Sequence, residues 1–321
     1  MVRSPNSVYN FMEFKHVSVL LEESLKALAL NQVGIYVDGT LGGAGHSFQI
    51  LSRTSHAKLI GIDRDDEALT AAGKRLSVFS DRTYLKKGNF CEVKRLVAEC
   101  GFSSINGGLL DLGVSSYQLD NGDRGFSYNH DAKLDMRMDQ SGGMTAYDVV
   151  NTYSKEQLTK VFRDYGEEKF AAQIAQKIVQ ARQESPVETT FQLVELIKLG
   201  IPAKNRREGG HPAKRVFQAI RIEVNNELGI LRDAINDFFD LLEPGGRLAI
   251  ITFHSLEDRI VKTAFNDFCR GCTCPPDFPI CVCGNKPKGR LVFKKPITAS
   301  EEELEVNSRS SCAKLRAIEK L

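Results

Sequence analysis

The chain has 321 residues, which is enough to bury a substantial core as one large domain or two intermediate ones. Hydrophobic residues make up 42% and charged residues 26%, which is ordinary for a globular protein, and no apolar run is long enough to cross a bilayer. The formal net charge is only +2, so a nucleic-acid partner cannot be argued from overall charge and must be argued from local patches.

Short apolar runs alternate with amphipathic or polar segments in the first third of the chain and again near its end. The expected strands are Gly34–Asp38, Lys58–Asp63, Arg82–Lys86, Gly108–Leu112 and Arg247–Phe253. The helices expected beside the last strand are Asn225–Leu242 and Ser255–Phe268, with a turn at residues 244–246. Strands that alternate with helices predict an α/β fold whose parallel sheet is covered on both faces. Residues 1–11 are polar and patternless, so we expect a mobile tail or a start upstream of the true one at Met12.

Between the fourth and fifth expected strands the pattern is helical throughout. Ser154 and Gln157 have the spacing of a capping box, and apolar residues at helical spacing follow them. A second stripe contains Phe170, Ile174 and Ile178, and a third helix is expected from Ser185-Pro186 onward, with proline in its first turn. These helices predict an insertion over residues 136–212 that divides an α/β domain into residues 1–135 and 213–321.

A glycine-rich turn between the first two expected strands is the most informative motif. Asp38 ends the first strand, the turn Gly39–His46 includes Gly43 and Gly45, and Asp63 ends the second strand about twenty residues later. In a βαβ unit this spacing places the turn against a nucleoside-containing ligand and directs the second carboxylate at the ribose hydroxyls. The turn does not spell G-x-G-x-x-G, and Asp38 would repel a pyrophosphate but attract the amine and sulfonium of S-adenosylmethionine. The motif therefore indicates a methyl-donor site.

Polar residues also follow two later strands. Asp111 ends one strand and Ser115 lies in the segment after it, where an amino-group methyltransferase would hold its target. The alternative for each strand-end aspartate is a cap on the next helix, and the serine also fits a simple turn. His254 is a candidate proton acceptor near pH 7. Alternatively, it is a turn residue before a helix that Ser255 caps with Asp258 at the third position.

Two basic runs are candidates for contact with phosphate groups. The first carries seven cations against the single acid Glu208: Lys198, Lys204, Arg206, Arg207, Lys214, Arg215 and Arg221. The second contains no acid: Lys286, Lys288, Arg290, Lys294 and Lys295. Such clusters neutralise nucleic-acid backbones, although a solvated basic face is the usual explanation of a lone run. Two runs beside an expected cofactor site favour a nucleic-acid partner.

Five of the eight cysteines lie in one proline-rich loop, residues 269–283, with the spacing C-x2-C-x-C-x6-C-x-C. They are Cys269, Cys272, Cys274, Cys281 and Cys283. This distribution differs from a secreted disulfide framework, and with no visible secretory leader it indicates a cytoplasmic protein. Closely spaced thiolates suggest a structural zinc ion, but only one gap has the usual length. A metal-free loop of reduced thiols stays open as the alternative.

Several long strings in the same order resemble the ribosomal RNA small subunit methyltransferase H family, from Lys15 to Arg316. The most specific strings are Asp38–His46, Asp111–Ser116, Arg124–Ser127, Leu134–Asp139 and Phe253–Arg259. The resemblance implies a class I (Rossmann-like) S-adenosylmethionine-dependent methyltransferase sheet with an inserted all-helical substrate domain. It also implies methyl transfer to the exocyclic N4 amine of a cytidine in 16S rRNA of the small ribosomal subunit.

The resemblance further implies which residues form the cofactor site. They are Ala44, Gly45, His46, Asp63, Phe90, Asp111 and Gln118. The turn and the two aspartates were also reached from spacing, whereas Phe90 and Gln118 depend on the resemblance alone. Two other functions compete with this one: a nicotinamide-dependent oxidoreductase and a non-catalytic rRNA-binding assembly factor. The imperfect glycine motif and Asp38 count against the oxidoreductase. Oligomeric state is left open.

Overall fold

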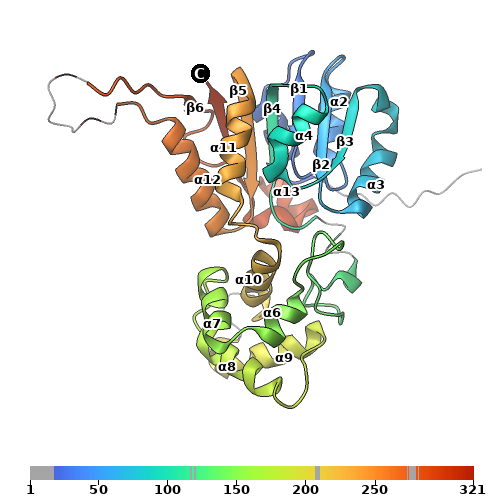
Figure 1. Cartoon of the computed structure of the whole chain (residues 1–321), viewed down its shortest axis with the longest axis vertical. Coiled ribbons are helices and arrows are strands. Elements are labelled where there is room, and N and C mark those ends of the chain that lie inside the picture. Colours follow the sequence, from blue (N-terminus) through green and yellow to red (C-terminus); the bar gives the residue numbers. More distant parts are fainter. Residues whose placement is uncertain are drawn as a thin grey trace, which may run out of the picture.

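The computed structural model describes residues 18–115, 118, 121–206, 210–272, 274, 280 and 282–321, so the expectation for residues 1–11 lies outside the described residues. An α/β part and an all-helical part lie one beyond the other along the longest axis of the molecule (Figure 1). Within the described residues, no helix has the length and apolar character needed to cross a membrane.

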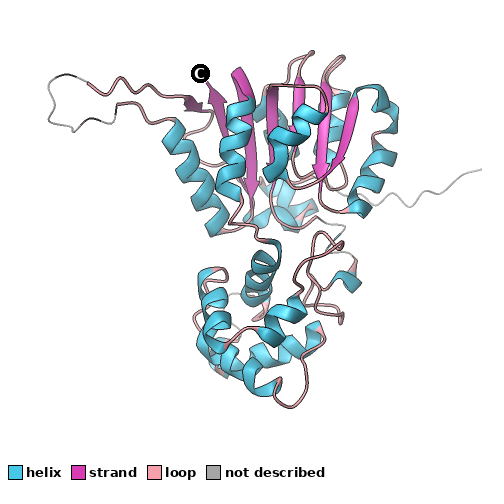
Figure 2. Ribbon diagram, in the orientation of Figure 1, coloured by secondary structure: helices cyan, strands magenta, loops and turns pink. Residues whose placement is uncertain are grey.

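One sheet of seven strands organises the α/β part (Figure 2), in the order β3-β2-β1-β4-β5-β7-β6. The strands are β1 Ile35–Asp38, β2 Lys58–Asp63, β3 Thr83–Lys87, β4 Ile105–Asp111, β5 Leu242–Thr252, β6 Gly289–Leu291 and β7 Lys314–Lys320. The first five are parallel, and β7 is antiparallel to both β5 and β6. This topology confirms the expected class I sheet. Its strand order reverses between β1 and β4, where α/β sheets bind ligands.

Apolar residues on both faces of the sheet explain why the strands read as continuous apolar runs. The flanking helices are α1 Leu21–Leu28, α2 Gly45–Ser52, α3 Asp66–Arg75, α4 Val93–Glu99, α11 Leu231–Leu241, α12 Ser255–Phe268 and α13 Glu301–Val306. Neighbouring residues of β2 belong to different clusters: Leu59 shares a cluster with Leu25 of α1, and Ile60 shares another with Phe238 of α11. Such double coverage is what a parallel sheet requires.

Two details near β5 differ from the sequence prediction. The single helix expected over 225–242 is wrong, because the chain turns at Asn226 with φ 49° and α11 begins only at Leu231. The turn expected at residues 244–246 lies inside the bounds of β5. There the register against β4 shifts between the pairs Ile105–Leu242 and Gly107–Arg247, and Gly245 has φ +81°. The turn is therefore an irregularity within the strand.

The helical part contains α6 Ala146–Thr152, α7 Lys155–Asp164, α8 Ala171–Ala181, α9 Thr190–Gly200 and α10 Lys214–Asn225. The capping box at Ser154 and Gln157 is confirmed. The start expected at Ser185-Pro186 is wrong, because Thr189 and Gln192 form the capping box that opens α9. One cluster of buried apolar residues runs from Phe126 to Ile220. The insertion boundaries at 136 and 212 stay a prediction.

Short 3-10 helices complete the described secondary structure. They are η1 Ser77–Arg82, η2 Phe90–Glu92, η3 Gly122–Arg124, η4 Ala203–Asn205 and η5 Ser308–Cys312.

Gly200 allows close packing of α9 on α8, so its replacement by alanine should weaken the helical part. A Cβ added at Gly200 would lie 2.7 Å from Ile174 Cα, and this backbone cannot move aside without separating the helices. We expect Gly200→Ala to lower the free energy of unfolding by about 1–3 kcal/mol in urea titration. Gly142→Ala is the control, since nothing lies within 4 Å of its added Cβ, and it should change stability by less than about 1 kcal/mol. Equal effects would contradict the packing argument.

Candidate active site

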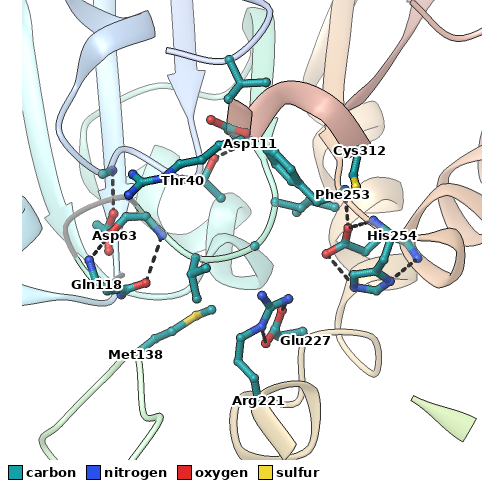
Figure 3. Close-up of a pocket in the computed structure, with 18 of the residues that line it drawn as sticks. Thr40, Asp63, Asp111, Gln118, Met138, Arg221, Glu227, Phe253, His254 and Cys312 are labelled. Atoms are coloured by element: carbon teal, nitrogen blue, oxygen red, sulfur yellow. Dashed lines mark hydrogen bonds and ion pairs between the residues drawn. The ribbon is translucent and has the colours of Figure 1, made fainter. Parts of the chain in front are cut away.

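A cavity of about 890 Å³ lies at the carboxyl ends of β2, β4 and β5, where the helical part meets the sheet (Figure 3). The predicted site residues that line it are Gly43, Gly45, His46, Asp63, Phe90, Asp111, Ser115, Gln118 and His254. The predicted residues Asp38 and Ala44 are not among its lining residues. The structure therefore brings together most of the residues that the sequence singled out.

The glycine turn gives the cavity a wall of backbone. Gly42 has φ +48°, a conformation that favours glycine, and its N–H donates to Asp63 Oδ2 over 2.7 Å. A Cβ on Gly39 would lie 2.5 Å from Leu110 Cδ2, so the chain here packs directly on β4. A Cβ on Gly43 would meet nothing within 4 Å. Ala44, which is buried with φ 57°, uses its N–H to donate to Leu41 O.

Asp38 lies behind this turn. Its carboxylate accepts from Ser47 Oγ at 2.6 Å and from Thr40 N at 3.2 Å, and the side chain is buried. Burial raises the pKa of Asp38 to about 6, although these hydrogen bonds act in the opposite direction. The residue thus supports the turn and the start of α2. The expectation that it faces the methionine amine stays a prediction, and the cavity lining gives it no support.

Asp63 ends β2 beside the turn. Its two oxygens accept from Gly42 N at 2.7 Å and from Asp65 N at 2.9 Å, so the carboxylate is fixed by backbone on both sides. Burial raises its pKa, and these two donors partly offset that effect. Each oxygen keeps a further acceptor position. A carboxylate fixed in this way at a strand end can accept hydrogen bonds from two neighbouring hydroxyl groups.

Asp111 is the acid with the most unusual surroundings. Its Oδ1 atom is buried and has no hydrogen-bond partner within the described residues, and its Oδ2 atom lies 4.0 Å from His46 Nδ1. Burial, followed by the charges of Asp38 and Glu257, raises the pKa of Asp111 to about 8. The side chain is nonetheless 27% exposed because it borders the cavity. A cation or a hydrogen-bond donor in the cavity would satisfy it.

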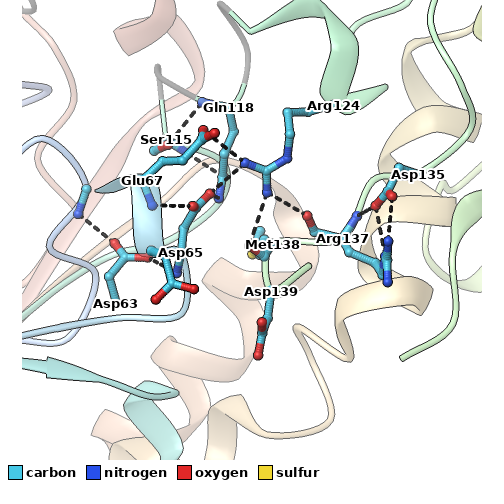
Figure 4. Close-up of polar contacts among 12 residues, drawn as sticks. Asp63, Asp65, Glu67, Ser115, Gln118, Arg124, Asp135, Arg137, Met138 and Asp139 are labelled. Atoms are coloured by element: carbon cyan, nitrogen blue, oxygen red, sulfur yellow. Dashed lines mark hydrogen bonds and ion pairs between the residues drawn. The ribbon is translucent and has the colours of Figure 1, made fainter. Parts of the chain in front are cut away.

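Gln118 and Ser115 line the cavity and belong to a polar network that reaches Asp65 and Arg124 (Figure 4). Ser115 N donates to Gln118 Oε1 at 3.1 Å, and Gln118 N donates to Ser115 Oγ at 3.2 Å. Gln118 Nε2 and Arg124 Nη1 both donate to Asp65 Oδ2, at 3.1 and 2.9 Å. Arg124 also donates to the carbonyl oxygens of residues 137 and 138. The family resemblance includes the string that begins at Arg124 but implies no role for this buried arginine.

His254 caps α12. The expectation that Ser255 is the cap is wrong: His254 Nδ1 accepts from Glu257 N at 3.5 Å, and Glu257 Oε2 accepts from Phe253 N at 2.8 Å and from His254 N at 3.3 Å. His254 Nε2 lies 3.1 Å from Glu257 Oε1, a distance that suits an ion pair when the ring is protonated. Burial opposes ionisation of Glu257, but His254 and Arg221 hold its pKa below the usual range.

The helical part supplies a wall that sequence reasoning missed. Arg221 of α10 forms a bidentate pair with Glu227, at 2.8 and 2.9 Å, and both line the cavity. Tyr128, another lining residue, stacks on His211 with ring centroids 4.4 Å apart. Val216, Phe217 and Ile220 form an apolar stripe at helical spacing, which could have predicted α10 from the sequence. The basic residues on either side of them indicated a phosphate-binding surface instead.

The basic runs are only partly available for phosphate groups. Arg221 is paired with Glu227, Lys198 lies 2.7 Å from Glu195, and Arg290 is paired with Glu319 of β7. Seven exposed residues of the runs have no acidic partner in the described residues: Lys204, Lys214, Arg215, Lys286, Lys288, Lys294 and Lys295. Arg207 and Glu208 lie outside the described residues. Fewer than seven cations of the first run are therefore shown to be available for phosphate groups.

Comparison with known proteins agrees with the resemblance. The model of the MraW methylase family matches residues 13–321. A ribosomal RNA small subunit methyltransferase H of Lachnospira eligens is 56% identical over 311 residues, which cover 97% of this chain and 99% of that protein. A protein of the same name from a Paenibacillus species is 56% identical over 315 residues, covering 96% and 100%. An rRNA methylase structure from Streptococcus thermophilus is 14% identical, with a TM-score of 0.43, and covers 95% of this chain and 99% of its own. The chain belongs to the MraW methylase family.

Proposed function

We propose that this chain transfers a methyl group from S-adenosylmethionine to the exocyclic N4 amine of a cytidine in 16S rRNA of the small ribosomal subunit. One observation carries the proposal: a single cavity combines a glycine turn and strand-end acids from the sheet with a wall from the helical part. The printed names of the relatives, ribosomal RNA small subunit methyltransferase H, agree with this substrate class. Bacterial ribosomes are assembled in the cytoplasm, so we expect the reaction there.

The residues present fit S-adenosylmethionine. When bound, this cofactor supplies an electrophilic methyl group on a positively charged sulfur. Asp111 Oδ1 is a buried acceptor without a partner in the described residues, which suits a cationic ligand. Asp63 is fixed with free acceptor positions for ribose hydroxyls. Phe90 provides an apolar face for the adenine. Gly43, Gly45, His46 and Gln118 complete the lining on that side.

The acceptor amine needs positioning more than activation. The lone pair of an exocyclic base amine is delocalised into the ring, so acceptors that hold its N–H groups can direct the lone pair at the methyl group. Ser115 and Asp111 lie at the end of β4 on this cavity and are our candidates for that role. The role of His254 as proton acceptor stays a prediction, and both of its ring nitrogens contact Glu257. A base is not required, because the methylated amine is acidic enough to lose its proton to water.

The helical part offers features suited to a nucleotide. Lys214 brings a cation to the cavity wall, and the stacked pair of Tyr128 and His211 presents aromatic surface beside it. Unstacked RNA bases bind to such surfaces, and phosphates bind to such cations. We therefore assign the acceptor nucleotide to the side of the cavity that these residues form.

The test is transfer of labelled methyl groups to small ribosomal subunits that lack the modification. Purified chain and methyl-labelled S-adenosylmethionine are incubated with these subunits, and the rRNA is digested to nucleosides. Label in N4-methylcytidine is the expected result. Cofactor binding with label in another nucleoside would show that the acceptor is not the N4 amine of a cytidine. Binding of RNA without any transfer would favour an assembly factor, and preference for a nicotinamide cofactor would favour an oxidoreductase.

Replacement of Asp63 by alanine should weaken S-adenosylmethionine binding by about 1–3 kcal/mol, because charge-assisted hydrogen bonds to the ribose are lost. Calorimetric titration measures the change directly. Asp66→Ala is the matched control, since Asp66 is an exposed aspartate three residues away that pairs with Lys87. Unchanged affinity in the Asp63 variant would remove this residue from the cofactor site.

A further inference from the structure

The cysteine-rich segment between α12 and β6 brings three sulfur atoms together. The Sγ atoms of Cys272, Cys274 and Cys283 all lie within 4.8 Å of one another. Cys272 and Cys283 are eleven residues apart in the chain, yet their Sγ atoms are separated by only 3.7 Å. Cys269 is not in this group, and Cys281 lies outside the described residues. Residues on the two described sides of the segment thus bring three thiols close together.

The sulfur spacing is that of a tetrahedral metal site. A zinc ion with Zn–S bonds of about 2.3 Å holds its sulfur ligands about 3.8 Å apart. The distance of 3.7 Å between the Sγ atoms of Cys272 and Cys283 matches this edge. Cys274 Sγ lies within 4.8 Å of both of these sulfur atoms and can supply a third vertex. Three thiols at this spacing are soft ligands that select zinc over hard cations.

Backbone N–H groups point at all three sulfur atoms. The donor–sulfur pairs are Cys274 N to Cys272 Sγ at 3.4 Å, Val282 N to Cys274 Sγ at 3.4 Å, and Asn285 N to Cys283 Sγ at 3.5 Å. Gly284 has φ +64°, and this left-handed turn directs the amide of Asn285 back at the preceding sulfur. Donors aimed at sulfur stabilise the thiolate that a metal requires.

The two aliphatic side chains described near the tip of the segment, Ile280 and Val282, do not pack into a core. Lys288 N donates to Phe268 O at 2.8 Å and joins the two ends at the base, and Asn285 Nδ2 donates to Gly271 O at 2.6 Å. Farther out, Ile280 and Val282 are each 74% exposed. Small units without a core depend on a covalent or metal cross-link. The three thiols are placed where such a cross-link would act.

We propose that Cys272, Cys274 and Cys283 bind a structural zinc ion that cross-links the two sides of this arm, residues 269–288. Each thiol releases its proton to solvent as it becomes a ligand, so no oxidant or reductant is needed. The arm carries Lys286 and Lys288, and the metal would fix these cations in place. The inference does not depend on the proposed methyl transfer.

Metal analysis of the full chain, purified without chelators, tests the proposal. We expect about one zinc ion per chain. Cys283→Ser and Cys272→Ser should each lose most of the metal, whereas Cys100→Ser, a cysteine outside the segment, should keep it. Cobalt substitution should give intense visible bands of a tetrahedral thiolate site in the parent chain and in Cys100→Ser only.

Limited proteolysis separates loss of the site from loss of the fold. In Cys283→Ser we expect new cleavage confined to residues 269–288, while the sheet stays resistant and the circular dichroism spectrum stays unchanged. A parent chain without zinc that gives only weak octahedral cobalt bands would overturn the proposal. So would full metal content in Cys283→Ser, or a disulfide between Cys272 and Cys283 in freshly isolated protein.

Discussion

Replacement of Arg124 by alanine should lower the free energy of unfolding by about 3–5 kcal/mol, because it leaves a buried carboxylate without its cation. The side chains of Arg124 and Asp65 are only 4% and 6% exposed, and Nη1 donates to Asp65 Oδ2 over 2.9 Å. The variant also removes the donor from the carbonyl oxygens of Arg137 and Met138, at 2.9 and 3.2 Å. Urea titration followed by circular dichroism measures the loss.

An exposed arginine provides the control for this experiment. Arg95 contacts both Glu92 and Glu99 on α4, but its side chain is 54% exposed. Surface pairs of this kind contribute about 0–1 kcal/mol, so Arg95→Ala should unfold close to the parent chain. Similar losses of unfolding free energy in the two variants would show that breaking the buried Arg124 pair destabilises the fold no more than breaking an exposed pair. Figure 4 shows why we expect otherwise, since Arg124 joins three separate segments.

Affinity for S-adenosylmethionine should rise as the pH is raised toward about 8, by up to about tenfold per pH unit, and then level off. Burial and the neighbouring carboxylates raise the pKa of Asp111 to about 8, so the group is protonated in the ligand-free protein below that pH. A cationic ligand favours the ionised form, and its binding therefore releases a proton. The rise begins at the lower pH at which Asp111 becomes ionised in the complex. Calorimetry in buffers of different ionisation enthalpy measures both affinity and released protons.

The same shift predicts how the ligand-free chain responds to pH. The pKa of Asp111 is higher in the folded chain than in the unfolded one, where it is near 4. Its contribution to stability is therefore complete below about pH 4 and is lost as the pH rises through about 8. Asp111→Asn removes the titrating group and should flatten both the stability and the affinity profiles above pH 6. If the affinity of this variant still rises steeply with pH, the proton released on binding comes from another residue.

Local sequence signals predicted the strand ends of the site well. Apolar runs that stop at Asp63 and Asp111 fix where parallel strands end, and strand ends gather at one edge of the sheet. Whether a strand-end side chain faces the cavity or the neighbouring helix was harder to predict. Asp38 also ends a strand, but its carboxylate turns to Ser47 in α2 and away from the cavity. That choice depends on packing between α2 and the turn, which spacing alone does not contain.

Features formed by distant segments were missed. Arg124 and Asp65 are 59 residues apart, and neither carries a local pattern that indicates its partner. β7 lies at the far end of the chain and inserts antiparallel between β5 and β6, which no alternation of strands and helices predicts. α10 was hidden because its cations suggested an RNA surface, although its apolar stripe packs in the helical part. Tertiary pairing decided each of these cases.

The bridge from Asp65 through Arg124 to the backbone of Met138 has a thermodynamic consequence. Asp65 lies two residues after Asp63, the acid that we propose for the ribose, and accepts from Gln118, whereas Met138 lines the same cavity from the segment that precedes α6. We expect a ligand that fixes one side to bias the position of the other through this shared arginine. Coupling of this kind is reciprocal. If the acceptor raises the affinity for the methyl donor by some factor, the donor raises the affinity for the acceptor by the same factor. Donor and acceptor would then assemble as a cooperative pair, with the same total free energy whichever arrives first.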